Sequence, residues 1–132
     1  MKLLLLLAAI FFACTNINAQ TFIELNNQFL ELFKKKAYTE SIPVGIKALA
    51  QAKIEYGETH ENFAIASHNL AESYYALKQF KPALPLYHQA TKVYAIAAKT
   101  NETSDIALCN NSIGVIYLSQ KKYDSSAIFF EI

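Results

Sequence analysis

The stretch HENFAIASHNLAESYYALKQFKPALPLYHQA, residues 60–90, contains two amphipathic patterns in succession. In the first half, apolar and small residues recur at steps of three and four, which places them on one face of a helix. They are Phe63, Ser67, Leu70, Ala71, Tyr74 and Leu77. From the second half onward, the same steps join Phe80, Ala83, Leu84, Tyr87, Ala90 and Tyr94. Only Lys78 and Gln79 separate the two patterns, so the stretch predicts an antiparallel helical hairpin.

The pattern returns along the chain at intervals of 42 and 43 residues. A forward shift of 43 places Ala71 on Gly114, Tyr74 on Tyr117, Phe80 on Tyr123, Ala83 on Ser126 and Tyr87 on Phe130. A backward shift of 42 places Phe80 on Tyr38, Pro85 on Pro43 and Ala90 on Ala48. Because proline inside a helix is costly, its return in phase indicates a repeated structure. One hairpin cannot bury both of its apolar faces, so the sequence predicts an all-α stack of hairpins.

These recurring residues resemble the signature of a known family. Leu70, Ala71, Tyr74, Phe80, Ala83, Tyr87 and Ala90 look like a tetratricopeptide (TPR) repeat. The period of 42–43 residues is similar to that of the long-period repeats of kinesin light chain. The resemblance covers roughly Thr21 to the C-terminus and implies a right-handed superhelical stack. The first repeat departs from the pattern, with Phe29 where a small residue is expected and Gly45 where an aromatic residue is expected.

The N-terminus has the features of an export signal. A short positive region, Met1-Lys2, precedes an apolar run from Leu3 to Phe12, and small Ala19 stands before Gln20. The run is about half the length that a permanent membrane span needs. We therefore expect cleavage after Ala19, a secreted or periplasmic product and no membrane insertion afterwards. The alternative is a lipid anchor on Cys14.

The expected organisation is a signal peptide over residues 1–19 and a helical repeat domain over residues 20–132. The repeats are expected at about 20–57, 58–100 and 101–132, the last one incomplete. The helices are expected from Thr21 to about Lys36, about Thr39 to Tyr56, about His60 to Leu77, Phe80 to about Lys99, Thr103 or Ser104 to about Gln120, and from near Tyr123 onward. Gly57 is expected to end the second helix in a left-handed conformation.

The last expected helix carries four large apolar side chains, Ile128, Phe129, Phe130 and Ile132. A repeat array normally closes with a polar face, so this pattern indicates that something covers the helix. The candidates are self-association with a second copy and a missing downstream domain.

Composition argues against several other classes. All 12 basic residues are lysine, and residues 20–132 hold 11 basic against 11 acidic residues, so no basic surplus favours nucleic acid. Three glycines and the cysteine and histidine spacings form neither a phosphate loop nor a metal motif. Cys109 with His68 could be imagined as a nucleophile and base, but a packing cysteine is favoured. We expect no enzyme activity, cofactor or metal.

The TPR resemblance implies a concave binding face built from the first helix of each pair. Carried over by position, this face holds Ile23, Asn26, Leu30, Phe33, Ile65, His68, Glu72, Tyr75, Leu108, Asn111, Val115 and Leu118. In the family, the phase of Asn26, His68 and Asn111 often carries an asparagine that bonds the backbone of an extended peptide. The predicted ligand-binding residues are Asn26, Phe33, His68, Glu72, Tyr75, Asn111 and Leu118. The alternative is that Asn26 and Asn111 are polar residues on a solvated face.

The resulting hypothesis is an exported, non-enzymatic module that binds a peptide or partner protein in the groove of its repeats. A second hypothesis is that the repeats form the sensory front of a longer membrane-bound regulator such as a histidine kinase. An apolar segment of about 20 residues downstream would favour the second.

Overall fold

A computed structural model describes residues 19–100 and 103–130 of the chain, and over these residues it contains six helices and no strand. The helices are α2 (Phe22–Lys34), α3 (Tyr38–Tyr56), α4 (Glu61–Ala76), α5 (Phe80–Ala98), α6 (Ser104–Ser119) and α7 (Tyr123–Phe130). All six helices predicted from the sequence are present, with ends within two residues of the expected positions. The export signal was predicted on residues 1–19, nearly all of which lie outside the described part of the chain.

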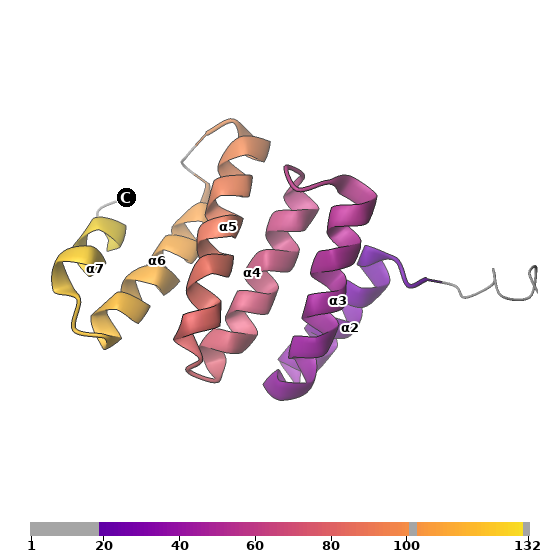
Figure 1. Cartoon of the computed structure of the whole chain (residues 1–132), viewed down its shortest axis with the longest axis horizontal. Helices are drawn as coiled ribbons and strands as arrows, with labels where there is room; N and C mark the ends of the chain where they lie inside the picture. The colour runs from indigo at the N-terminus through magenta and orange to yellow at the C-terminus, as the bar shows by residue number, and fades with distance from the viewer. Residues whose placement is uncertain (1–18, 101–102, 131–132) are drawn as a thin grey trace, which may run out of the picture.

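The helices form three antiparallel hairpins that stack side by side, α2–α3, α4–α5 and α6–α7 (Figure 1). The second helix of each hairpin also packs on the first helix of the next one. Apolar residues from all three hairpins join in one core cluster. The predicted all-α stack of hairpins is therefore confirmed. None of the described helices is both long and apolar enough to cross a bilayer.

In the first and third hairpins an aromatic ring packs on a glycine of the facing helix, but the two hairpins carry the ring on opposite helices. The equivalent positions of α4–α5 hold Ala71 on the first helix and Tyr87 on the second, and both are completely buried. In α6–α7, a Cβ on Gly114 would lie 2.8 Å from Cζ of Phe130, so the ring covers the glycine backbone. In α2–α3 the ring is Phe29 on the first helix, 1% exposed, and a Cβ on Gly45 of the second helix would lie 3.1 Å from it.

The departure of the first repeat from the family pattern is thus an exchange of sides. We call the space between these two facing positions of a hairpin its slot. Two rings in one slot would overfill it, and two small residues would leave a cavity, because protein interiors are close-packed. One ring facing one small residue fills the slot, whichever of the two helices carries the ring. The exchange therefore leaves the ring of the first hairpin buried, with Phe29 only 1% exposed.

The three hairpin turns share one backbone geometry. Lys36, Lys78 and Lys121 have φ angles of 59°, 58° and 59°, in the left-handed region. In the first turn, the N–H of Lys36 donates to the carbonyl of Phe33 and that of Ala37 to the carbonyl of Leu32. This is the Schellman pattern, and the other two turns repeat it. A left-handed residue with a Cβ costs roughly 1–2 kcal/mol, which the satisfied carbonyls offset.

The link between the first two hairpins differs from the expectation. Gly57 ends α3 with φ 85° and ψ 167°, which is an extended mirror-image conformation and not the predicted left-handed helical one. Glycine adopts this region without strain because it lacks a Cβ. The chain is thereby turned so that the His60 ring stacks on Tyr56 at 4.8 Å and His60 Nδ1 accepts from the N–H of Asn62, capping α4.

Buried polar groups also fix the register between hairpins. The hydroxyls of Ser41 on α3 and Ser73 on α4 are fully buried and lie 2.7 Å apart, within hydrogen-bond distance. Within the first hairpin, the exposed residue Glu55 on α3 accepts from the N–H of Phe22, the first residue of α2. The serine contact disfavours sliding of α3 along α4, because a shift would leave buried hydroxyls without partners.

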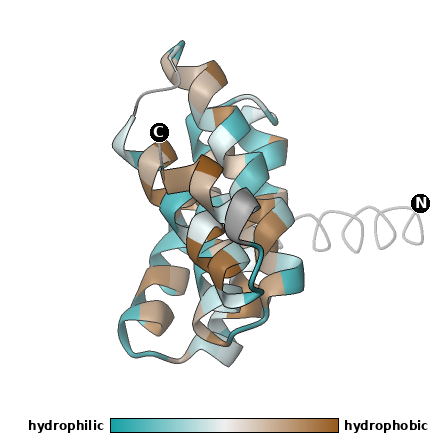
Figure 2. Cartoon of the chain, turned by 90° about the vertical axis from the view of Figure 1, so that its left-hand side faces the viewer, coloured by the Kyte–Doolittle hydropathy of each residue, from teal (hydrophilic) through white to brown (hydrophobic). Residues whose placement is uncertain are grey.

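Helix α7 carries apolar side chains on two faces. Phe129 is half-buried against Tyr117 and His88, at ring distances of 5.6 and 5.8 Å. Ile128 and Phe130 remain 61% and 48% exposed. Figure 2 views the stack from the α6–α7 end and shows hydrophobic residues on the helices nearest the viewer. The predicted apolar surface on this helix is present, and what covers it stays a prediction.

The exchanged ring predicts a specific coupling between Phe29 and Gly45. Phe29→Ala should lower the free energy of unfolding by about 3–5 kcal/mol through a cavity. Gly45→Phe should lower it through a steric clash. The double variant restores the arrangement of the second hairpin, so it should be more stable than the sum of the two losses by about 1–3 kcal/mol. Urea unfolding of the three variants measures this coupling.

The control combines Phe29→Ala with Phe130→Ala, whose rings belong to different hairpins, and these two losses should add. If Phe29→Ala and Gly45→Phe are simply additive as well, the two positions do not share one slot.

Candidate peptide-binding face

Several exposed hydrophobic side chains lie along the first helices of the hairpins. Ile23 and Leu30 on α2 are 57% and 45% exposed, and Leu108 and Leu118 on α6 are 56% and 46% exposed. All four stand at positions assigned to the concave face from the sequence. Ile65 on α4, also assigned to this face, is half-buried. We call these five side chains the apolar row. Such a row on neighbouring helices is a common feature of protein-binding surfaces.

On α2, the two predicted ligand-binding residues have partners within the protein. The side-chain amide of Asn69, on α4, donates to Oδ1 of Asn26 at 2.8 Å. Phe33 is half-buried between Phe29 and Tyr38, with ring distances of 5.9 and 5.1 Å. Asn26 therefore joins the first helices of two neighbouring hairpins, and it retains its own amide hydrogens for a ligand.

On α4, His68, Glu72 and Tyr75 surround a tyrosine of the next helix. The Tyr87 hydroxyl donates to Oε1 of Glu72 at 2.5 Å, and His68 Nε2 lies 3.5 Å from the same oxygen. The rings of His68 and Tyr75 lie 6.0 and 6.3 Å from that of Tyr87. Ser112 on α6 also donates to Glu72 Oε1, at 3.5 Å. One carboxylate oxygen thus connects α4, α5 and α6.

The charge of Glu72 is stabilised inside this network. Partial burial raises the pKa of the carboxyl, but the hydrogen bonds from His68 and Tyr87 outweigh burial and leave the pKa below its ordinary value. Burial, with the neighbouring carboxylate, raises the pKa of Tyr87, so its hydroxyl stays protonated and keeps donating. Glu72 has a structural role here in addition to the ligand-binding role predicted for it.

On α6, the remaining predicted residues, Asn111 and Leu118, are exposed. The predicted set is therefore divided. Asn111 and Leu118 face solvent, whereas Asn26, Phe33, His68, Glu72 and Tyr75 are partly buried and, in each case, contact other side chains. The structure brings His68, Glu72 and Tyr75 together around Tyr87, and it leaves Asn26 and Asn111 on separate helices.

Residues that sequence reasoning missed include Asn69 and Ser112, which connect successive first helices. Asn26, Asn69 and Ser112 follow one another at intervals of 43 residues, so the repeat period itself carried this signal. Two hollows were also missed. One lies among Glu61, Tyr94, Ala97, Ala98, Thr103 and Asp105, and the other among Glu58, Thr59, Phe63, Gln89, Lys92, Val93 and Ile96. Neither is lined by a predicted ligand-binding residue.

Cys109 is a packing residue in this fold. Its side chain is completely buried, and burial raises the pKa of the thiol to about 12. A nucleophilic cysteine needs the opposite, a pKa lowered toward neutrality. Among the described residues, no three His, Cys, Asp or Glu side chains gather as metal ligands would.

The lowered pKa of Glu72 predicts an acid-sensitive contribution to stability. The contribution should be complete above the ordinary carboxyl pKa and lost as the pH falls through the lower folded value. Glu72→Gln should therefore cost about 1–3 kcal/mol of unfolding free energy at pH 7. This difference from wild type should shrink as the pH falls below the ordinary carboxyl pKa. Urea unfolding across this pH range measures it, and Glu31→Gln, an exposed carboxylate on α2, is the control. A difference that does not change with pH would contradict the assigned network.

Comparison with known proteins agrees with the geometry. A family model described as tetratricopeptide repeat matches residues 32–96, about half of the chain. The match runs from the end of α2 through α5 and so includes the central hairpin whole. A search of curated proteins finds no match. The family match shows that residues 32–96 are tetratricopeptide repeat, and the stacked hairpins that contain and follow them have the arrangement expected of such repeats.

Proposed function

We propose that this protein is an exported, non-enzymatic interaction module that binds an extended peptide or partner segment across α2, α4 and α6. Tetratricopeptide repeats are typically protein-interaction modules, which supports the general class. The observation that favours this face is the apolar row, in which Ile23, Leu30, Leu108 and Leu118 remain exposed beside polar Asn111.

The chemistry of the face suits a peptide backbone with apolar side chains. Exposed leucines can cover alternate side chains of a strand-like ligand, and burying each one fully contributes about 1.5–3 kcal/mol. The Asn111 amide can both donate to and accept from a peptide unit. The Glu72 network holds α4, α5 and α6 in fixed relation, so the face is formed before a ligand arrives, which lowers the entropic cost of binding.

We also propose that the repeats are of the long-period type found in kinesin light chain. The left-handed lysines of the three hairpin turns, Lys36, Lys78 and Lys121, follow one another at 42 and 43 residues. This spacing exceeds the 34 residues of the common repeat. The extra residues lie in longer second helices, since α3 and α5 each have 19 residues.

Matched substitutions can locate the binding face. Leu30→Ser with Leu108→Ser should weaken binding about tenfold or more, because both side chains belong to the apolar row. The probe is a peptide selected from a random displayed library on the wild-type chain, and its dissociation constant is measured by fluorescence polarisation. The unfolding free energy should change little, since both side chains are exposed.

The control is Ile46→Ser with Ile54→Ser, two isoleucines of α3 that are 50% and 77% exposed. They have the same chemistry and lie on a second helix, so affinity should stay within about twofold of wild type. An equal loss of affinity in both double variants, or a loss of affinity only in the α3 variant, would show that the peptide binds outside the apolar row.

Export can be tested on the N-terminus of the natural protein. Mass spectrometry of protein purified from its native cells should find Gln20 as the first residue, as cleavage after Ala19 requires. The expected location is the periplasm or the medium. A chain that begins at a lipid-modified Cys14, or one that retains residues 1–19, would contradict this form of the proposal.

A further inference from the structure

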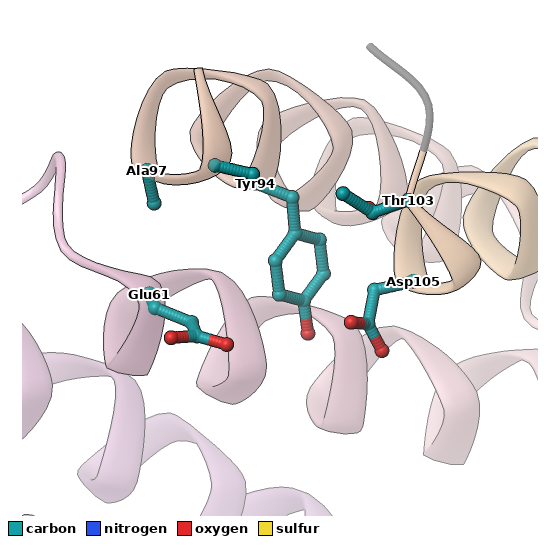
Figure 3. A pocket seen from close by; sticks show the side chains of 6 residues that line it. Glu61, Tyr94, Ala97, Thr103 and Asp105 are labelled. Carbon is teal, nitrogen blue, oxygen red and sulfur yellow. The ribbon is translucent and has the colours of Figure 1, made fainter. Parts of the chain in front are cut away.

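A small hollow lies where the first turns of α4 and α6 meet the last turns of α5. It measures about 100 Å³ and is lined by Glu61, Tyr94, Ala97, Ala98, Thr103 and Asp105. We call it the α5 hollow. Figure 3 shows the Tyr94 hydroxyl directed into it, between the carboxylates of Glu61 and Asp105. These residues come from three helices of two hairpins, and none belongs to the predicted ligand-binding set.

Tyr94 is the unusual member of the α5 hollow. The residue is only 5% exposed, and its ring packs edge-on against His68 at 6.5 Å. Buried tyrosine hydroxyls usually find a hydrogen-bond partner, as Tyr87 does with Glu72. The Tyr94 hydroxyl makes no hydrogen bond to another of the described residues. The Tyr94 residue is therefore largely buried, while its hydroxyl reaches the accessible space of the hollow without a partner among the described side chains.

Two negative charges face the same space. Glu61 and Asp105 stand in the first turns of α4 and α6, where the helix dipole favours carboxylates. The ion pairs found within the described residues use Glu58 and Glu72, so neither carboxylate of the α5 hollow is neutralised by a lysine or histidine there. Burial, then Asp105 and Glu61, raise the pKa of Tyr94, which keeps the hydroxyl neutral. The α5 hollow thus combines two anions and one polar hydroxyl.

We propose that the α5 hollow binds a primary ammonium group, in particular the side-chain ammonium of a lysine on a partner chain. An ammonium has three donors, which matches the two carboxylates and the oxygen of Tyr94. A water occupies about 30 Å³ of liquid, so 100 Å³ holds an ammonium with a few methylene groups. The methyl groups of Ala97 and Ala98 offer an apolar wall for the lysine stem.

A calcium ion fits this set of residues less well. Calcium takes six to eight oxygen ligands, commonly from carboxylates and carbonyls, whereas the α5 hollow offers two carboxylates and a phenol. The remaining oxygen, Oγ1 of Thr103, already accepts from the N–H of Ile106 at 3.2 Å and caps α6. The proposal is independent of peptide binding on the apolar row, because no residue is shared between the two surfaces.

The test is a titration of the isotopically labelled chain with Nα-acetyl-lysine methylamide, followed by NMR. We expect saturable shifts of the Tyr94 and Asp105 signals, with a dissociation constant on the order of millimolar for a single ammonium site. The Nε-acetylated analogue, which lacks the charge, should produce no such shifts. Asp105→Asn and Tyr94→Phe should each weaken binding at least fivefold, and both substitutions keep the packing volume.

Glu40→Gln is the matched control, because it removes one exposed carboxylate from the first turn of α3 outside the hollow, and it should bind like wild type. Alanine amide carries a free α-amine and no side-chain ammonium. Its binding should be weaker than that of the lysine compound, and equal or tighter binding would contradict the lysine assignment. Absence of saturable shifts, equal binding of the acetylated analogue, unchanged affinity in Asp105→Asn and Tyr94→Phe, or shifts with calcium chloride alone would each overturn the proposal.

Discussion

The structure depends on one steric constraint, that each hairpin has room for one aromatic ring facing one small residue. This slot sets the distance between the two helices of a hairpin, and the stacking of hairpins follows from that distance. Gly114 with Phe130 satisfies it in the family's usual orientation, which the buried residues Ala71 and Tyr87 share by position, and Phe29 with Gly45 satisfies it in reverse. The quantity that repeats along the chain is the combined volume of the two facing side chains. The family's usual residue types are one way to supply that volume.

This explains how much of the fold could be predicted from the sequence. Helix type, order and ends follow from local periodicity and from the turn residues. The turn residues repeat at 42 and 43 residues, whichever helix of a hairpin carries the aromatic ring. The packing of the first hairpin could not be predicted position by position, because Phe29 and Gly45 each contradict the family pattern and agree with it only as a pair. Gly57 was identified as the end of α3, but its ψ angle accompanies the stacking of Tyr56 on His60, which no local pattern announces.

The candidate face was predicted less completely than the fold, because the sequence located its helices but not the contacts between its side chains. The TPR resemblance placed the residues of the apolar row on the first helices, since a position within a repeat can be assigned without knowledge of how one helix meets the next. The pairing of Asn26 with Asn69 and of Glu72 with Ser112 requires the register between neighbouring hairpins, which buried contacts such as Ser41 with Ser73 set. The α5 hollow has no local signal at all, because Glu61 and Asp105 are 44 positions apart and meet only when three helices pack.

The reversed slot of the first hairpin bears on how such arrays can evolve. Recombination that joined α2 to a second helix like α5 would bring Phe29 and Tyr87 into a single slot, and the opposite junction would leave Ala71 facing Gly45 across a void. Breakpoints between hairpins preserve every slot, whereas breakpoints inside a hairpin do not. A junction inside the first hairpin would therefore require a compensating change at position 29 or 45, whereas a junction between hairpins would require none.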